Sequence, residues 1–161
     1  MISTDLSKVK IFVDNPFHDK RGYLWTSWEK KKFILPFNQD KFSISKKNVI
    51  RGLHGDNKTW KLLSCVSGKI FLVVVNYDPE SKEYLKWNSW ILNETDGVQI
   101  LIPPKFLNAH LCLSNRCTFH YKLYFRGKYN DVKNQYSVRW NDSRLKINWP
   151  IKKPILSKRD K

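Results

Sequence analysis

The chain has 161 residues, a length that suits one domain with its own hydrophobic core. Apolar residues make up 41% and aromatic residues 14%, which excludes a disordered chain, and no stretch approaches the roughly 20 apolar residues that span a bilayer. The net charge of +16 fits a nucleic-acid-binding protein, but the basic residues are spread along the chain and not gathered in one stripe. This spread favours a smaller polyanion, such as a nucleoside diphosphate, as the ligand.

The predicted elements are short β-rich runs separated by turn residues, without long helical periodicity. A short helix is predicted around Ser27–Lys32, where Leu35-Pro36 would stop it. Many short strands at regular spacing predict an all-β sandwich or barrel, and a jelly-roll barrel could hold a small polar molecule inside. In chain order, the predicted strands are Val9–Val13, Gly22–Ser27, Phe42–Ile44, Lys61–Val66, Lys69–Asn76, Asn88–Leu92, Val98–Ile102, His110–Leu113, Thr118–Phe125 and Tyr136–Trp140.

The three cysteines are too few and too scattered for a disulfide framework. Cys65 and Cys112 lie in apolar runs, and neither forms a CxxC pair with Cys117. The polar start of the chain lacks the apolar region of a secretory signal. Together these features predict buried free thiols and a cytoplasmic protein.

The most informative motif for chemistry is Arg51-Gly52-Leu53-His54, which places two polar side chains in an apolar segment. A lone histidine in such a place is more often structural than catalytic. Two further features favour catalysis: Lys61 leads directly into an apolar strand, and Asp160 offers a carboxylate that could orient a histidine.

Motifs along nearly the whole chain resemble the dTDP-4-dehydrorhamnose 3,5-epimerase family, the RmlC-like branch of the cupins. Each motif alone is moderately specific, whereas their order and spacing together are strongly so. The resemblance extends from about residue 9 to the end and implies a single cupin domain, 1–161, an all-β jelly-roll barrel with a few short helices. The matching segments are Asp19–Gly22, Arg51–His54, Lys61–Gly68, His110–Ser114, Tyr121-Lys122, Trp140–Asp142, Asn148–Pro150 and Pro154–Asp160.

This resemblance implies the inversion of carbon centres beside the ketone of a nucleotide-linked 4-keto-6-deoxy sugar, in bacterial surface polysaccharide synthesis. His54 would be the base and Tyr121 the acid on the opposite face. Lys61 would stabilise the enolate, and Asp160 would orient His54. Tyr121 has two rivals on its own strand, His120 and Tyr124, although strand alternation forbids His120 and Tyr121 from sharing one face.

The resemblance also implies a nucleotide site, no cofactor, and a homodimer with exchanged N-terminal strands. Arg51 and Arg21 would hold the diphosphate, with Arg21 reaching the partner's pocket. The histidines show no H-x-H pattern and no histidine–carboxylate cluster, so no metal is predicted. Further substrate contacts are expected from Thr26, Gln39, Lys41 and Asn108.

Three departures from the family pattern concern substrate choice. Thr26 stands where a glutamate is usual, and Lys41 replaces an asparagine in the Q-x-N motif that begins at Gln39. Both put thymidine recognition in doubt, so a GDP-linked heptose competes with a dTDP-linked hexose. Asn108 takes the place of a second histidine and cannot titrate. The segment between Tyr121 and Trp140–Asp142 is also longer than usual in this family, with Arg126–Asp131 as an extra turn at the expected pocket mouth. Inversion at C3, at C5 or at both therefore stays open.

Two other classes of function remain as alternatives. A sugar-nucleotide 3,4-ketoisomerase also uses a histidine base in a jelly roll, but it typically carries more histidines after the first motif, where this chain has Gly55–Asn57. A non-catalytic sugar-binding cupin has no use for a base and an acid on opposite faces.

Overall fold

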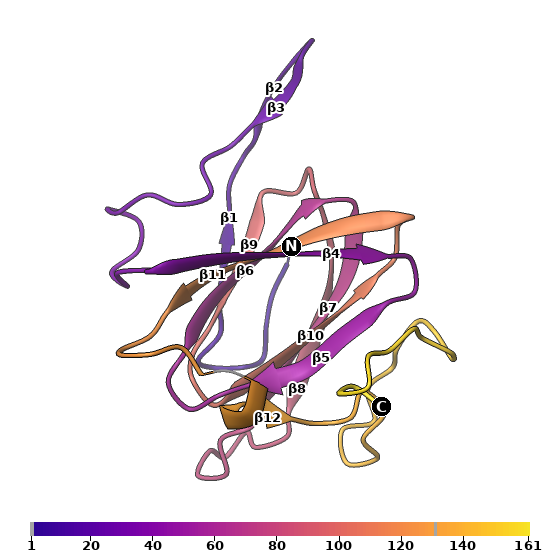
Figure 1. Cartoon of the computed structure of the whole chain (residues 1–161). Coiled ribbons are helices and arrows are strands. Elements are labelled where there is room, and N and C mark those ends of the chain that lie inside the picture. Colours follow the sequence, from indigo (N-terminus) through magenta and orange to yellow (C-terminus); the bar gives the residue numbers. More distant parts are fainter. Residues whose placement is uncertain (1, 131) are drawn as a thin grey trace.

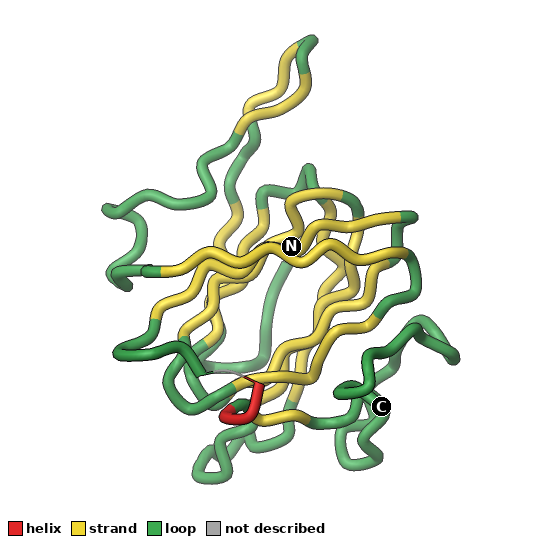
Figure 2. The backbone as a smooth tube through the Cα atoms, viewed as in Figure 1, coloured by secondary structure: helices red, strands yellow, loops and turns green. Residues whose placement is uncertain are grey.

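The computed structural model describes residues 2–130 and 132–161, and its regular secondary structure consists almost entirely of strands joined by turns and loops (Figures 1 and 2). The strands are β1 Lys10–Val13, β2 Phe17–Asp19, β3 Gly22–Leu24, β4 Gln39–Lys46, β5 Ile50–Gly55, β6 Trp60–Ser67, β7 Lys69–Asn76, β8 Trp87–Asn93, β9 Val98–Ile102, β10 Phe106–Cys112, β11 Arg116–Tyr124 and β12 Tyr136–Ser137, with one 3₁₀ helix, η1, at Val132–Asn134.

Two five-stranded antiparallel sheets form the body of the molecule (Figure 1). The first has the strand order β1-β9-β6-β11-β4, and the second has the order β12-β5-β10-β7-β8. Strands adjacent in space are mostly distant in sequence, as in the jelly roll that the strand pattern predicts. The prediction of an all-β cupin-type barrel is confirmed.

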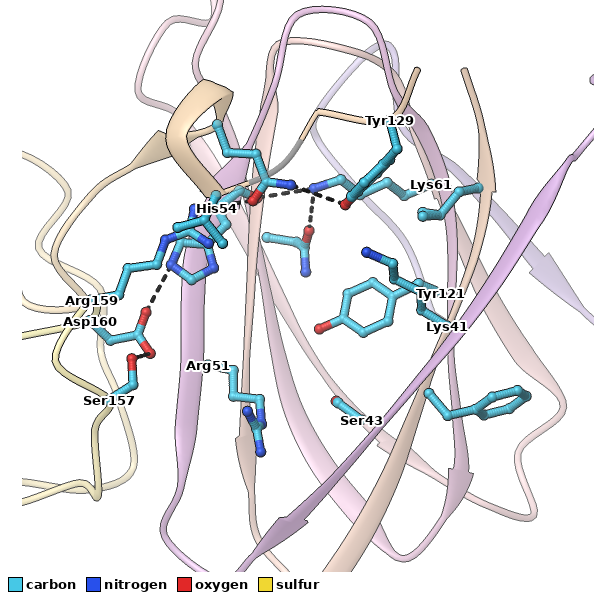
Figure 3. Close-up of a pocket in the computed structure, with 15 residues that line it drawn as sticks. Lys41, Ser43, Arg51, His54, Lys61, Tyr121, Tyr129, Ser157, Arg159 and Asp160 are labelled. Atoms are coloured by element: carbon cyan, nitrogen blue, oxygen red, sulfur yellow. Dashed lines mark hydrogen bonds and ion pairs between the residues drawn. The ribbon is translucent and has the colours of Figure 1, made fainter. Parts of the chain in front are cut away.

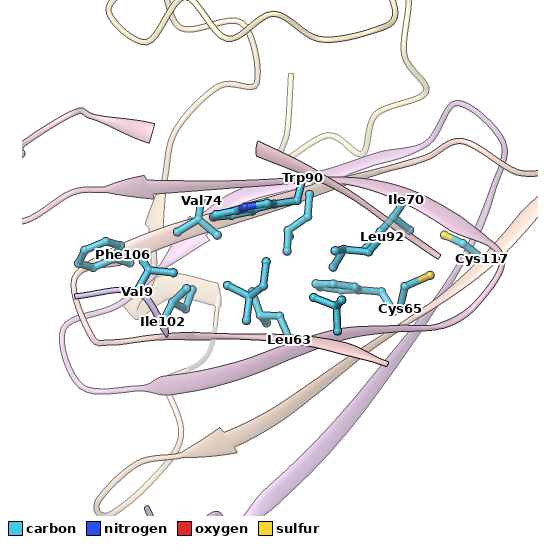
Figure 4. Packing of buried hydrophobic residues seen from close by; sticks show 14 of the residues in the cluster. Val9, Leu63, Cys65, Ile70, Val74, Trp90, Leu92, Ile102, Phe106 and Cys117 are labelled. Carbon is cyan, nitrogen blue, oxygen red and sulfur yellow. The ribbon is translucent and has the colours of Figure 1, made fainter. Parts of the chain in front are cut away.

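The main core lies between the two sheets (Figure 4). On β7, Ile70, Leu72 and Val74 face this core, whereas Val73 and Val75 face a second cluster under the C-terminal segment. Both faces of β7 are therefore buried, which explains why its sequence is a continuous apolar run and does not alternate.

The segment after β3 does not form the helix expected around Ser27–Lys32. Residues 25–38 run as turns, bends and irregular chain, and Phe33 packs on the outer face of the first sheet. Leu35 and Phe37 pack against the same cluster, so the apolar residues alternate with period two. This spacing suits an irregular chain lying on a sheet, and tertiary packing outweighs the local tendency to form a helix.

Several strand boundaries also differ from the expectation. β4 is longer than Phe42–Ile44, and β10 begins four residues before His110. β5 was not expected as a strand because its two glycines, Gly52 and Gly55, interrupt the apolar run. Within the described ranges, no helix is long and apolar enough to cross a membrane.

The hairpin formed by β2 and β3 extends away from the body (Figure 1). Its apolar side chains meet solvent, with Phe17 64% and Leu24 74% exposed. An isolated two-stranded hairpin with exposed apolar residues is marginally stable in water, so this arm has the character of a contact surface.

Candidate active site

A cavity of about 520 Å³ opens at one end of the barrel, between the two sheets (Figure 3). Its walls come from β4, β5, β6, β10 and β11, together with the segment before β12 and the C-terminal tail. The residues that line it are Lys41, Phe42, Ser43, Arg51, His54, Lys61, Asn108, Tyr121, Leu123, Tyr129, Val132, Gln135, Ser157, Arg159 and Asp160.

His54 and Asp160 form a close pair on the β5 side of the cavity. The His54 Nε2 atom lies 2.8 Å from Asp160 Oδ1, and the Asp160 side chain is 4% exposed. Ser157 Oγ donates to the other carboxylate oxygen at 2.7 Å. Burial by itself raises the pKa of Asp160, but hydrogen bonds from His54 and Ser157 hold it below its ordinary value. These contacts favour the ionised form of Asp160, whose carboxylate lies where it could orient the His54 ring.

A β-bulge brings Arg51 and His54 to the same cavity. These residues are three apart, so a regular strand would point them to opposite faces. The pairing of β5 with β10 shifts here, because His54 lies opposite Asn108 while Arg51 lies opposite His110. Between these two pairs, Gly52 and Leu53 of β5 lie opposite the single residue Ala109 of β10, and the extra residue restores the common direction. Gly52 has φ +121° in this bulge, and a Cβ there would lie 2.5 Å from the Asn108 carbonyl oxygen.

Lys61 lies at the inner end of the cavity, from the start of β6. Its ammonium group donates to Asn108 Oδ1 at 2.8 Å and to the His54 carbonyl oxygen at 3.1 Å. Burial lowers the pKa of Lys61 to about 8, while the charge of Asp56 acts in the opposite direction. An ammonium group in such a place is poised to gain from a negative charge that develops in the cavity.

Tyr121 faces the cavity from β11, across from His54 (Figure 3). Burial raises the pKa of Tyr121 to about 12, against a smaller effect of its hydrogen bond with Ser43. The phenol is therefore neutral and available as a proton donor at pH 7. The Phe119 ring supports it edge-on, with 4.5 Å between the ring centroids.

The two rivals of Tyr121 lie outside the cavity. His120 points to the other face of its sheet, where its Nε2 lies 2.7 Å from Asp40 Oδ1. The Tyr124 hydroxyl accepts a hydrogen bond from Arg126. Lys122 also pairs with Asp40, at 2.9 Å, as a salt-bridged surface lysine.

The cavity has a strongly positive lining. Arg51, Lys41 and Arg159 face it besides Lys61, and Asp160 is the one carboxylate among the lining residues that the structure describes. A hydrogen bond from Arg51 Nε to Ser45 Oγ on β4, at 3.0 Å, holds the Arg51 side chain in place. Such an arrangement suits a ligand with several negative charges.

Three of the expected substrate residues do not line this cavity. Arg21 is at the tip of the β2–β3 hairpin, paired with Asp19 at 2.6 Å and with its side chain 81% exposed. Thr26 is exposed in the loop that follows the hairpin, and Gln39 begins β4 outside the lining set.

Sequence reasoning missed several lining residues, most notably Tyr129, Gln135 and Arg159. Tyr129 lies in the extra turn Arg126–Asp131, whose last residue is outside the described residues, so the expectation of a modified mouth pointed to the right segment. Arg159 directly precedes Asp160, and this adjacency was a usable signal. Gln135 had none, because its place depends on the loop conformation.

Metal-ligating side chains do not gather in the described part of the chain: no group of three or more histidines, cysteines or carboxylates is suitably placed to hold an ion. The three cysteines are buried and free, as expected.

A jelly-roll barrel with a histidine, a lysine and a tyrosine converging on one cationic cavity defines a class of enzyme that moves protons on an anionic substrate. Comparison with known proteins makes the class specific. The family model of dTDP-4-dehydrorhamnose 3,5-epimerase matches residues 3–161. The chain belongs to this family, and it is an isomerase.

Individual relatives agree over nearly the full length. The dTDP-4-dehydrorhamnose 3,5-epimerase of Salmonella typhimurium is 34% identical, and the match covers 99% of this chain and 91% of the relative. The crystal structure of the Legionella pneumophila 3,5-epimerase in complex with dTDP-4-keto-L-rhamnose is 30% identical, with a TM-score of 0.90 and coverage of 99% and 88%. The Bacillus anthracis enzyme with TDP and pyrophosphate bound has the same identity and TM-score, with coverage of 99% and 94%.

Proposed function

We propose that the protein inverts C3, C5 or both in a nucleoside-diphosphate-linked 4-keto-6-deoxy sugar. The observation that carries this proposal is the convergence of His54, Lys61 and Tyr121 on one cavity, with the imidazole and the phenol on facing sheets. C3 and C5 both flank the C4 ketone, so a proton on either carbon is acidic enough for a histidine to remove.

The reaction balances without a further reagent. His54 takes the proton from the carbon beside the ketone, and the electrons of the broken C–H bond place a negative charge on the ketone oxygen. Lys61 stabilises this enolate, a contribution of about 3 kcal/mol by analogy with oxyanion holes. Tyr121 returns a proton to the same carbon from the opposite face, and solvent then restores the protonation states of both residues.

For the nucleotide part of the substrate we propose dTDP first, because the relatives at 30–34% identity carry that nucleotide in their names. GDP, in a GDP-linked heptose, is the second candidate. One observation favours it: the Lys41 ammonium group lies 3.9 Å from the centroid of the Tyr129 ring inside the cavity. An ammonium group there could donate to the O6 and N7 acceptors of guanine.

Incubation of dTDP- and GDP-linked 4-keto-6-deoxy sugars with the enzyme in D₂O tests these proposals. Deuterium at C3, at C5 or at both identifies the carbon and the preferred nucleotide together. Migration of the carbonyl group would indicate a 3,4-ketoisomerase instead. Binding without any exchange would indicate a sugar-binding cupin, and steeply salt-dependent binding of DNA or RNA alone would indicate a nucleic-acid-binding protein.

We also propose a homodimer in which the N-terminal arms are exchanged. The arm Phe17–Leu24 exposes apolar side chains, and β4 is an edge strand with exposed Phe42 and Ile44. A partner's arm could cover both and bring its Arg21 to the phosphate side of the cavity.

Mixed dimers of two inactive variants test this arrangement. Arg21→Ala and His54→Ala should each lose activity, and their mixture should regain part of it, because one pocket then combines an intact His54 with the partner's intact arm. A mixture that stays inactive, although mass measurement shows mixed dimers, would contradict the exchange.

We also propose that the enzyme works in the cytoplasm, where free thiols persist, and that it supplies sugars for bacterial surface polysaccharides.

A further inference from the structure

The Gln135 side chain at the cavity mouth connects two segments that are distant in sequence, the loop after β11 and the C-terminal tail. The Gln135 amide nitrogen donates to the Tyr129 hydroxyl at 3.0 Å and to the Asn130 carbonyl oxygen at 2.9 Å. Its amide oxygen accepts from Arg159 Nη2 at 3.1 Å. Gln135 therefore joins the loop that follows β11 to the C-terminal tail.

The tail is the segment that carries Asp160, the partner of His54. It has no regular secondary structure near its end, and the last residues of a chain fray unless they are tied down. At its start, Ile155 pairs with the backbone around Asn48. At its end, Arg139 Nε donates to the Lys161 carbonyl oxygen at 3.1 Å. Between these anchors, the contact of Arg159 with Gln135 is a side-chain tie directly next to Asp160.

We propose that Gln135 is a positioning residue of the epimerase: it fixes Arg159, and through Arg159 the neighbouring Asp160, against the loop that carries Tyr129. The side chain thereby links the base side of the cavity, His54 with Asp160, to the chain that continues from the acid strand β11. This inference rests on the proposed function for its kinetic consequences, but its structural part stands without it.

The chemistry of an amide explains why glutamine suits this place. Its oxygen can hold a guanidinium group without cancelling the positive charge, whereas a carboxylate would neutralise it. Arg159 thus remains a cation facing the cavity while its direction is fixed. At the same time the amide nitrogen satisfies the Tyr129 oxygen, and burial raises the pKa of Tyr129, so this phenol stays neutral. Glutamine provides a donor and an acceptor in one side chain, which neither methionine nor glutamate can do.

Two substitutions separate the two properties. Gln135→Met keeps the length and loses both hydrogen-bonding groups, so Arg159 loses its tie to the loop while the anchors at Ile155 and Lys161 remain. Gln135→Glu keeps an acceptor for Arg159 and so keeps the tail tied to residue 135, but it loses the donor to Tyr129 and to the Asn130 carbonyl oxygen and offsets the charge of Arg159 that faces the cavity. We expect Q135M to lower kcat for deuterium exchange about tenfold, in line with the loss of a hydrogen bond to a charged group. We expect Q135E to keep kcat within about threefold and to raise KM about tenfold.

The background variant Asp160→Asn shows whether Gln135 acts through Asp160. In this background, Q135M should change the exchange rate less than about twofold, since the group that it positions is already impaired. A general loss of stability would instead lower the rate by the same factor in both backgrounds, and this result would overturn the proposal, as would equal kcat values for Q135M and the wild type.

Amide hydrogen exchange of residues 154–161, measured by mass spectrometry in the absence of substrate, gives a readout that does not require activity. Tail amides of Q135M should exchange about tenfold faster than those of the wild type, and those of Q135E should match the wild type. Unchanged exchange in Q135M overturns the proposal. A wild-type enzyme that exchanges no proton with any keto sugar contradicts the proposed function instead, and the tail measurement then decides on Gln135 alone.

Discussion

Replacing Lys61 by methionine should give a protein that is inactive and yet more stable at neutral pH. The Lys61 side chain is buried, with the residue 6% exposed, and its pKa falls from 10.5 to about 8 because burial disfavours the ammonium form. A shift of this size means that, at pH values below 8, the charged form of Lys61 lowers the free energy of unfolding by about 3 kcal/mol relative to a neutral side chain. Methionine has nearly the same length and no charge to bury.

The gain is smaller than this figure, because methionine also leaves two acceptors unpaired. The His54 carbonyl oxygen and Asn108 Oδ1 each lose the hydrogen bond from Lys61, at a cost of about 1 kcal/mol apiece. The expected net gain at pH 6.5 is therefore about 1 kcal/mol, or a rise in melting temperature of roughly 2–4 °C for a chain of this size.

The pH dependence makes the test specific. Below pH 8 both the folded and the unfolded states hold the Lys61 proton. Between about 8 and 10.5 the folded state releases it first, so the unfolded state binds more protons and wild-type stability rises with pH. Urea unfolding at pH 6.5, 8 and 9.5 should show the advantage of K61M shrinking and then reversing. Lys69→Met, at an exposed lysine, controls for the loss of one charge from a chain of net +16. An advantage that stays constant across this range would refute the reasoning.

Three further predictions concern the reaction and the bulge. The kcat/KM of the wild type should fall as pH rises through about 8, where Lys61 loses its charge. In the variant Lys61→Arg this fall should move above the measurable pH range, because arginine keeps its charge. A fall near pH 8 that persists in K61R would belong to the titration of another group. Tyr121→Phe should retain deuterium exchange beside the ketone while losing inversion, as followed by NMR of the sugar, and normal inversion in this variant would remove Tyr121 from its role. Gly52→Ala should lower the free energy of unfolding in urea by at least about 2 kcal/mol, because the added Cβ would lie 2.5 Å from the Asn108 carbonyl oxygen and residue 52 has φ +121°. A near-neutral effect would show that β5 can move away from β10.

Strand content and the chemistry-bearing residues could be predicted because their signals are local. The run Ile70–Val75 has strand length and β-branched side chains, and its burial on both faces follows from that composition. Arg51, His54 and Lys61 stand out because charged or titratable groups interrupt apolar segments. The resemblance to the epimerase family then implied that these residues, together with Tyr121 and Asp160, belong to one site.

The features that could not be predicted depend on contacts between distant segments. The bulge at Gly52 exists only because β5 pairs with β10, and no local pattern reveals that Arg51 and His54 share a face. The segment 25–38 does not form a helix, because Phe33 packs on a sheet formed by later strands. Gln135 enters the site through a loop whose conformation its own sequence does not specify.

The position of Asn108 has a consequence for the chemistry at the ketone. A histidine in this place would share protons with Lys61 and add a second titration at the inner end of the cavity. Asparagine accepts the Lys61 hydrogen bond at 2.8 Å with its oxygen and leaves its amide nitrogen as a neutral donor. In the proposed mechanism, Lys61 then carries the ionisable charge near the enolate oxygen, with a pKa of about 8 set mainly by burial. A diphosphate sugar bound there would bring negative charge into the same cavity and favour the ammonium form, so the substrate itself would strengthen the group proposed to stabilise the enolate.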